Sequence, residues 1–283
     1  MIEKTSELWA DLHMHSYYSD GILSPEAIVK YAAKIGLNCI AITDHDTVKA
    51  VDEATEAGNK HNVEVLTGIE LSTTWDGRDI HVLGYCFDHT DAALDAQLQL
   101  YRDERRHRAI RIIDRLQKQG MEITIEEVEM KAGRGVIGRP HIADVMLSKK
   151  LAYNINDVFA RFLGPDGTAY EDKYKISPRF AVELIEKAGG VAVLAHPTLN
   201  MKETHVYDMI KAGIHGIECI HPKHTADSTA YYRRLTVQYG LEESGGSDCH
   251  GRGQVPLIGQ YRVPYSVVQR LKDRAQALRK VNA

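Results

Sequence analysis

The segment ELWADLHMHS, residues 7–16, sets the pattern for the whole chain, because a short apolar run leads directly into two histidines, His13 and His15. In a β-strand, residues i and i+2 point to the same face, so the two imidazoles would lie side by side, close enough to bind one metal ion. A chance pair of surface histidines is the alternative, since a lone H-x-H motif is a weak signal. The rest of the chain has to decide between them.

The same arrangement of an apolar run followed by a loop recurs along the sequence. We interpret six further segments as strand-to-loop junctions: NCIAITDHD (38–46), VEVLTGIE (63–70), DIHVLGYCF (79–87), GVAVLAHP (190–197), GIECIH (216–221) and SGGSDCH (244–250). Helical patterns lie between them, at residues 24–36, 48–61, 177–190 and 226–240. In the first of these, Ser24 is the expected N-cap, Pro25 suits the first helical position and Gly36 suits the end. Alternating strands and helices predict a parallel α/β architecture.

Composition limits the class of protein. The chain has 283 residues, 43% hydrophobic and 26% charged, which fits either two domains or one α/β barrel with an insertion. The formal charge of −4 gives no global sign of a nucleic-acid or membrane partner. No apolar run approaches the roughly 20 residues of a spanning helix, and MIEKTSELWA lacks a signal-peptide core, so we expect a cytoplasmic protein. The four scattered cysteines are expected to be small buried residues.

Metal-binding side chains concentrate at the predicted strand ends, which in barrel folds converge on one rim. They are His13, His15, His45, Glu70, His196, Asp248 and His250, whereas His81 lies near the start of its run. Imidazoles and carboxylates without cysteine suit Zn, Mn or Fe. The set exceeds the four ligands of one tetrahedral zinc ion, so two or three ions would have to share it. This predicts metal-assisted hydrolysis without a protein nucleophile.

Competing catalytic motifs are absent from the sequence. It contains no G-x-x-x-x-G-K-[ST], no G-x-S-x-G and no H-E-x-x-H. GRGVIG, residues 133–138, matches G-x-G-x-x-G by letter, but a charged helical pattern precedes it and Pro140 follows closely. We therefore expect a loop there and no dinucleotide site.

The motifs DLHMHS, SDG, TDHD, GIE, AHP and GSDCH, in this order, resemble those of the PHP (polymerase and histidinol phosphatase) superfamily. The resemblance covers about residues 8–262. It implies an α/β fold, a distorted (β/α)7 barrel, with two or three divalent metal ions (Mn, Zn or Fe) as cofactors.

The resemblance also implies a role for each matching position. His13, His15, Glu70 and Asp248 would hold the first metal ion; Glu70 would bridge to a second ion, held also by His81 and His196; Asp20, His45 and His250 would hold a third. The candidate catalytic residues are Asp20, His45, His196 and His250. His196 and His250 are candidates for protonating the leaving oxygen, but a nitrogen that binds metal cannot do so.

One branch of the superfamily fits best. GRPHIADVML, VFARFLG, AYEDKYKISPRFAVELIEKAGGVAVLAHP and ECIHPKHT resemble enzymes that act on nucleoside 3′,5′-bisphosphates and the 5′ ends of short RNAs. The implied activity is phosphoester hydrolysis through a metal-bound hydroxide; the alternatives are histidinol-phosphate phosphatase and a non-catalytic metal-binding module. Thr168-Ala169 replaces a Lys-Pro pair of some relatives, which leaves phosphate recognition there open. Cys249, often an aromatic residue in relatives, should point away from the metals.

In residues 99–170 the predicted alternation of strands and helices stops. The segment 100–120 predicts a helix with an apolar stripe at Ala109, Ile112, Ile113 and Leu116, and its interleaved arginines and acids indicate a solvated face. Three shorter helical patterns follow. The expected organisation is therefore a barrel from residues 8–98 and 171–265, a helical lid at 99–170 and a C-terminal helix at 266–283.

The expected partner is a small phosphorylated substrate, a nucleotide or a short RNA 5′ end, without a membrane or an extended nucleic-acid surface. The candidate substrate-binding residues are Arg134, Arg139, Lys173 and His224. An arginine at a helix N-terminus makes a phosphate site, and the alternatives are a surface salt bridge or solvated loop residues. Asp44 is expected to orient an imidazole, and Asp46 either does the same or caps the helix near Val48.

Overall fold

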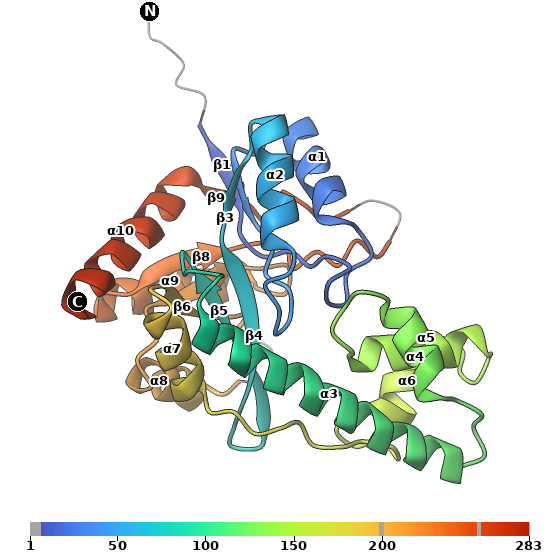
Figure 1. Cartoon of the computed structure of the whole chain (residues 1–283). Coiled ribbons are helices and arrows are strands. Elements are labelled where there is room, and N and C mark those ends of the chain that lie inside the picture. The colour runs from blue at the N-terminus through green and yellow to red at the C-terminus, as the bar shows by residue number, and fades with distance from the viewer. Residues whose placement is uncertain (1–6, 198–200, 254–255, 283) are drawn as a thin grey trace, which may run out of the picture.

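The computed structural model describes residues 7–197, 201–253 and 256–282, and within them the strands form two sheets (Figure 1). The four-stranded sheet has the order β3 (Glu64–Leu66), β2 (Cys39–Ala41), β1 (Trp9–Asp11) and β9 (Val263–Pro264). The five-stranded sheet has the order β4 (Gly68–Trp75), β5 (Arg78–Tyr85), β6 (Val191–Leu194), β7 (Gly216–Ile220) and β8 (Glu242–Gly245).

Backbone hydrogen bonds join the two sheets at both sides. Leu12 N donates to Gly245 O at 3.2 Å, which connects the end of β1 to β8. Asp46 N donates to Glu70 O at 3.0 Å, which connects the loop after β2 to β4. The loops that carry the predicted site therefore face one another across these junctions.

The prediction of a parallel sheet is only partly right, because the sheets are mixed. β4 pairs antiparallel with β5, β5 with β6, and β1 with β9. Asp76 and Gly77, with φ of 49° and 69°, form a two-residue turn that makes β4 and β5 a hairpin. VEVLTGIE, interpreted as one strand, is divided between β3 and β4, which belong to different sheets.

The helices that flank the sheets are α1 (Pro25–Lys34), α2 (Val51–His61), α7 (Pro178–Lys187), α8 (Glu203–Lys211), α9 (Ala226–Tyr239) and α10 (Tyr265–Asn282). The predicted start of α1 is confirmed, since the Ser24 side chain accepts a hydrogen bond from Ala27 N at 3.1 Å and Pro25 is the first helical residue. Gly36 follows the helix with φ of 78°. Residue 283, the last of the expected C-terminal helix, lies outside the described residues.

The segment at residues 99–170, which departs from the alternation of strands and helices, is helical, as predicted. It contains α3 (Ala92–Lys118), α4 (Ile125–Ala132), α5 (Arg139–Ser148), α6 (Ile155–Val158) and the π-helical turn η1 (Phe159–Leu163), and it extends away from the sheets in Figure 1. The loop expected for residues 133–138 is confirmed between α4 and α5.

α3 connects this helical segment to the rest of the molecule. It begins at Ala92, capped by Asp91, earlier than the predicted residue 100. Its first turns place Leu94 and Leu98 in the core beneath the five-stranded sheet. Its later turns place the predicted apolar stripe in a separate core with α4 to η1. None of the helices in the described part of the chain combines the length and the apolar character that crossing a membrane requires.

Candidate metal centre

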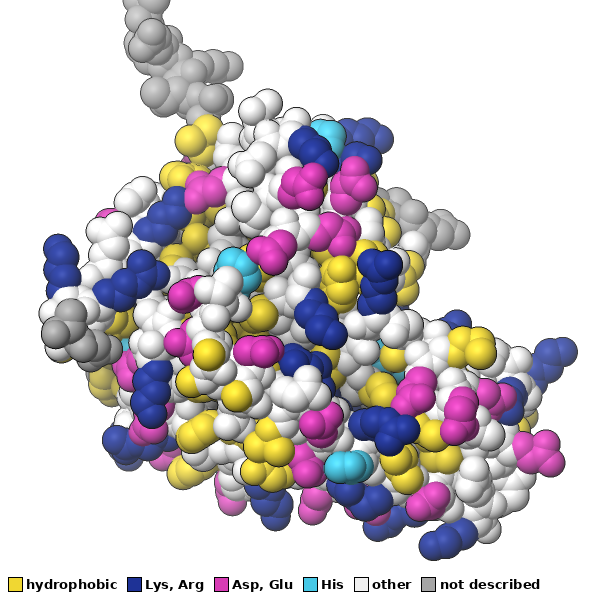
Figure 2. Space-filling view, viewed as in Figure 1, with side chains coloured by type: hydrophobic (Ala, Val, Ile, Leu, Met, Phe, Trp, Pro, Cys, Tyr) yellow, Lys and Arg dark blue, Asp and Glu magenta, His cyan; other side chains and the backbone are white. Residues whose placement is uncertain are grey.

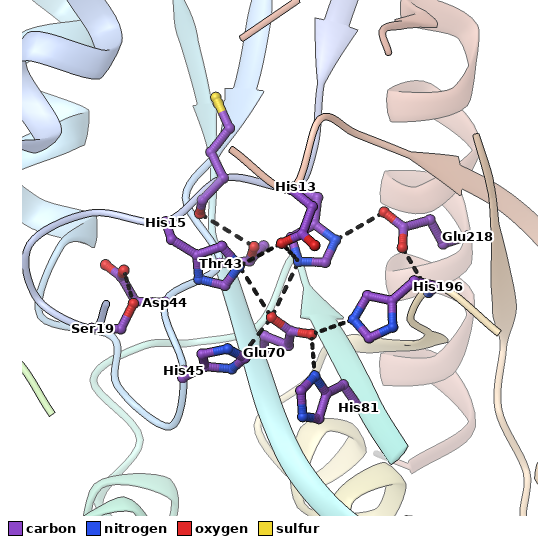
Figure 3. Close-up of polar contacts among 12 residues, drawn as sticks. His13, His15, Ser19, Thr43, Asp44, His45, Glu70, His81, His196 and Glu218 are labelled. Carbon is purple, nitrogen blue, oxygen red and sulfur yellow. Dashed lines mark hydrogen bonds and ion pairs between the residues drawn. The ribbon is translucent and has the colours of Figure 1, made fainter. Parts of the chain in front are cut away.

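The Glu70 carboxylate on β4 lies at the centre of the site, surrounded by imidazoles (Figure 3). Oε2 of Glu70 is 3.1 Å from His13 Nε2, 3.2 Å from His15 Nε2 and 3.3 Å from His45 Nδ1. Its Oε1 is 2.8 Å from His81 Nδ1 and 3.0 Å from His196 Nε2. The structure thus brings together residues of four separate predicted junctions around one buried carboxylate.

The remaining predicted ligands extend this cluster. Asp248 Oδ1 lies 3.1 Å from His15 Nε2, and His250 Nε2 lies 3.2 Å from Asp20 Oδ1. Donor atoms within 4.8 Å of one another form four overlapping groups: His15, Asp20, His45 and His250; His13, His15 and Asp248; His13, Glu70 and His196; His45, Glu70 and His81. Every predicted ligand occurs in at least one group, and Glu70 belongs to two.

The hairpin explains how His81, near the start of its strand, reaches the site. In the β4–β5 register, Glu70 pairs with Leu83 and Ser72 pairs with His81. His81 is therefore the diagonal neighbour of Glu70 on the same sheet face, which is within reach of a long side chain. In a parallel arrangement this contact would not form.

Two supporting residues in β7 and the loop after it were not found by sequence reasoning. Glu218 Oε1 accepts a hydrogen bond from His13 Nδ1 at 2.9 Å, which directs His13 Nε2 toward Glu70, and its Oε2 accepts one from His196 N at 2.7 Å. His221 Nδ1 accepts a hydrogen bond from Lys223 N, so its Nε2 donates to Asp248 Oδ2 at 3.1 Å. The sequence feature that could have identified Glu218 is its position as a charged residue inside the apolar run GIECIH.

Two aspartates beside His45 have different roles from those expected. Asp44 accepts hydrogen bonds from Ser16 N at 2.7 Å and Ser19 Oγ at 2.6 Å, which orders the loop that carries Asp20. Within the described part of the chain, no imidazole donates to Asp44. Asp46 caps no helix, because α2 begins later, after Ala50. It accepts from Ser72 N at 2.8 Å and forms an ion pair with Arg105 at 2.6 Å.

The backbone of the site adopts a rare conformation at two predicted ligands. His196 has φ of 28° and Asp248 has φ of 48°, in the left-handed region. For residues other than glycine this conformation costs of order 1–3 kcal/mol and persists only where the surroundings impose it. The hydrogen bonds that His196 N donates to Glu218 and that His221 donates to Asp248 supply such surroundings.

Burial and mutual attraction act in opposite directions on the charges of the cluster. Burial alone would raise the pKa of the Glu70 carboxyl, but the charges of His45, His13 and His81 hold it well below its usual range. Burial alone would lower the pKa of His15, but hydrogen bonds to Asp248 and Glu70 raise it to about 10. The carboxylates are therefore ionised at neutral pH and available to cations.

The donor set fits divalent metal ions. Among the described residues, His15 Nδ1, His45 Nδ1 and His81 Nε2 are buried without a properly oriented hydrogen-bond partner, which is costly for imidazole nitrogens unless a ligand satisfies them. Imidazoles with carboxylates match Zn, Mn or Fe. Cys249 packs with Met14 and Ile28 in the core, so it points away from the cluster as expected.

A cavity of about 150 Å³ opens beside His45, His81 and Asp20. Its other side is lined by four cationic residues, Arg105, Arg108, Arg139 and Lys173, and by Phe159. Figure 2 shows Lys and Arg side chains interspersed with Asp and Glu over the visible face, including the region where the helical segment meets the rest of the molecule. The expectation of a wholly solvated arginine face on α3 is therefore wrong for Arg105 and Arg108.

The four candidate substrate-binding residues do not lie together. Arg139 and Lys173 line the cavity. Arg134 lies outside it, where its guanidinium interacts with the hydroxyls of Tyr17 and Tyr18. His224 lies behind His221, with ring centroids 5.4 Å apart, and its Nδ1 donates to Cys219 O at 3.0 Å.

This arrangement of a carboxylate-bridged histidine cluster on mixed sheets agrees with the comparison to known families. The model of the PHP domain matches residues 11–239. The chain belongs to the PHP domain family.

Relatives in this family carry several phosphoesterase names. A 5′-3′ exoribonuclease of Haemophilus influenzae is 36% identical over 245 residues, covering 85% of this chain and 89% of the relative. A phosphoribosyl 1,2-cyclic phosphate 1,2-diphosphodiesterase of Eggerthella lenta is 34% identical over 260 residues, covering 90% and 98%. A 3′,5′-nucleoside bisphosphate phosphatase of Chromobacterium violaceum is 30% identical over 250 residues, covering 86% and 88%.

A solved structure supports the same assignment. A Bifidobacterium adolescentis protein assigned as a metal-dependent phosphoesterase superposes with a TM-score of 0.86 at 29% identity, over 94% of this chain and 96% of that one. The enzyme class expected from the sequence, a metal-dependent PHP phosphoesterase, is confirmed.

Proposed function

We propose that the cluster around Glu70 holds two or three divalent ions and that the protein hydrolyses nucleoside 3′,5′-bisphosphates or the 5′ ends of short RNAs. The observation that carries the proposal is that Glu70 presents its two oxygens to two different sets of imidazoles, as a bridging carboxylate does. The ligands would be His13, His15, Asp20, His45, Glu70, His81, His196, Asp248 and His250. The two joined sheets would form the distorted (β/α)7 barrel.

Divalent ions bound there would lower the pKa of a coordinated water and neutralise charge on the phosphoryl oxygens. The protein's own groups orient the ligands and bind the rest of the substrate. His250 Nδ1 donates to Asp248 O at 2.9 Å, and its Nε2 points toward Asp20 Oδ1 at 3.2 Å, so Nε2 is the nitrogen that would bind a metal ion shared with Asp20. We infer that His250 is a ligand and does not act as the proton donor to the leaving oxygen.

The cavity favours nucleotides over histidinol phosphate. Its cationic wall attracts an anionic substrate group next to the metal centre, whereas the ammonium and imidazole of histidinol phosphate would be repelled. The names of the relatives from Haemophilus influenzae and Chromobacterium violaceum support RNA 5′ ends and bisphosphates. The relative from Eggerthella lenta makes a cyclic ribosyl phosphate the second candidate.

The first experiment combines metal analysis of the purified protein with analysis of the hydrolysis products formed in the presence of Mn²⁺. Monoesters and bisphosphates would release phosphate, RNA would release mononucleotides, and a cyclic phosphate would open to a monoester. The substrates are adenosine 3′,5′-bisphosphate, a short 5′-phosphorylated RNA, histidinol phosphate, a cyclic ribosyl phosphate and an aryl phosphate. We expect at least two ions per chain and fastest turnover of the bisphosphate or the RNA. Fewer than two ions would refute the ligand set, and faster turnover of histidinol phosphate would refute the substrate. Bound ions without turnover would instead favour a non-catalytic module.

We also expect substrate binding to weaken at alkaline pH because of Lys173. Burial, opposed by Asp79 and reinforced by Arg105, Arg139 and Arg108, lowers the pKa of its ammonium to about 8. The group is a cation below this value and loses its charge as pH rises through it, while the phosphate is already dianionic above its second pKa of about 6. KM should therefore rise between about pH 7.5 and 9.5.

The matched variant for this measurement is Lys173→Arg, since a guanidinium keeps its charge throughout the range. KM of the variant should be flatter with pH than KM of the wild type. Identical profiles for the two proteins would show that Lys173 does not titrate in substrate binding.

A further inference from the structure

Two of the proposed ligands are carried by loops. Asp20 lies in the loop of residues 16–23, and His250 lies in the loop of residues 246–253. His250 Nε2 is 3.2 Å from Asp20 Oδ1, and Ile22 N donates a hydrogen bond to His250 O at 3.0 Å, so the two loops are joined. Side chains on loops are held less precisely than side chains on strands, so the geometry of this pair depends on what packs against the loops.

The helical segment packs directly against the loop that carries Asp20. Val136, between α4 and α5, donates its amide to Tyr18 O at 2.9 Å. A Cβ added to Gly135 would lie 2.6 Å from Ser19 O, which shows how closely the two backbones approach. The helical segment and the backbone of a proposed metal ligand are therefore in contact.

Arg252 connects α5 to both loops. Its Nη1 and Nη2 donate to Asp144 Oδ1 and Oδ2 at 3.1 Å each, and Nη2 also donates to Asp20 O at 3.4 Å. Arg252 itself lies two residues after His250. Most surface ion pairs contribute little, but a guanidinium that binds both oxygens of one carboxylate is the stronger form. Arg252 thus links α5, the backbone of Asp20 and the loop of His250.

The charge of Arg252 does not explain its position. A guanidinium beside Asp20 and His250 repels a metal ion, so its charge by itself would weaken metal binding there. Asp144 balances that charge. What remains is a geometrical effect, because Arg252 fixes the carbonyl group of Asp20 and with it the backbone from which the Asp20 carboxylate projects toward His250.

We propose that Arg252 and Asp144 are positioning residues, which couple the helical segment to the ion held by Asp20 and His250. Packing of α5 against the loops sets the geometry in which Asp20 and His250 bind one ion, and by linkage the bound ion stabilises that packing. The ions at Glu70 rest on the sheets and do not depend on this contact. The inference rests on the proposed function for its ligand set, and it is independent of the substrate.

The test is a calorimetric titration of the metal-free protein with Mn²⁺, which requires no turnover. Asp20→Asn identifies the ion that uses the loop carboxylate. Arg252→Gln should raise the Kd of that ion about 10-fold and change the Kd of the other ions less than about two-fold. Asp144→Asn should have the same effect. Because both residues act through one contact, the double variant should bind no more weakly than either single variant.

The sign of the Arg252→Gln effect separates positioning from charge. Removal of a cation would by charge alone tighten Mn²⁺ binding, so unchanged or tighter binding of this ion would overturn the inference. The matched control is Arg161→Gln, which removes an arginine that pairs with Asp157 inside the helical segment at 3.2 Å. It should leave every Kd unchanged. An equal loss in the control would assign the effect to general loosening of the helical segment and would also overturn the inference.

Hydrogen exchange provides a second readout, at residues 133–138. Mn²⁺ should slow exchange there in the wild-type protein, because the ion stabilises the packing that protects the Val136 amide. In Arg252→Gln this protection should be largely lost. Equal protection in the two proteins would show that the ion acts on the helical segment without Arg252.

The failure of this inference differs from the failure of the proposed function. If Asp20→Asn loses no ion, the coupling fails, while hydrolysis by the ions at Glu70 stands. If no substrate is hydrolysed, the proposed function fails, and the titration and hydrogen exchange still decide whether Arg252 and Asp144 position the ligands.

Discussion

Glu70→Gln is expected to reduce phosphoester hydrolysis by roughly 10³-fold or more, with loss of bound metal. The substitution keeps the shape of the side chain but removes the negative charge that faces His13, His15 and His45 on one oxygen and His81 and His196 on the other. A neutral amide cannot bridge two cations as a carboxylate does, and the loss of several kcal/mol of charge stabilisation corresponds to that factor.

The measurement is metal content per chain together with turnover of the best substrate. Glu129→Gln is the matched control, because this partly exposed Glu pairs with Arg106 on the helical segment, away from the metal centre. It should keep full metal content and rate. A Glu70→Gln protein with two or more tightly bound ions and near wild-type turnover would show that Glu70 is not a bridging ligand.

Gly246→Ala is expected to destabilise the fold by about 3 kcal/mol or more, at or above the upper end for overpacking. A Cβ at this position would lie 2.3 Å from His13 N and 2.5 Å from His13 Cβ. The obstacle is backbone, which cannot move aside without shifting β1 against β8, the junction that Leu12 N and Gly245 O hold. The displaced His13 should also lose its contact with Glu70, so metal content should fall.

Urea unfolding of the metal-free protein measures the first effect, and metal analysis measures the second. The control is Gly240→Asn, at the end of α9, where φ of 62° and ψ of 38° suit asparagine and no atom lies within 4 Å of the added Cβ. Its midpoint should change little. An unchanged midpoint for Gly246→Ala would mean that the β1–β8 junction adapts at little cost.

The sequence alone determined the local features of the site. The H-x-H spacing predicted that His13 and His15 share one face. They lie just beyond the end of β1, on either side of the isolated bridge at Met14, and both reach Glu70 Oε2. The start of α1 was likewise predicted from its local cap signals. Most of the ligand set followed from the repeated placement of His, Asp and Glu after apolar runs, whereas Asp20 and His81 were implied by the family resemblance. The structure brings these side chains into one cluster.

The tertiary structure decided what depends on chain direction and on neighbours distant in sequence. The apolar run at β5 is compatible with either direction, and only the turn at Asp76 and Gly77 makes it antiparallel, which brings His81 beside Glu70. Glu218 and His221 can orient the predicted ligands because β7 lies next to β6 and β8.

Arg108 is the clearest example of a residue whose burial the sequence alone does not determine. The charge pattern of α3 is that of a solvated helix, and helical periodicity says only which residues share a face. It does not say what covers that face. The loop at Glu171 and the start of α5 cover Arg108, and this packing turns a surface cation into a buried one beside the metal centre. This burial comes from segments more than 30 residues away in the chain, with Glu171 O 63 residues from Arg108.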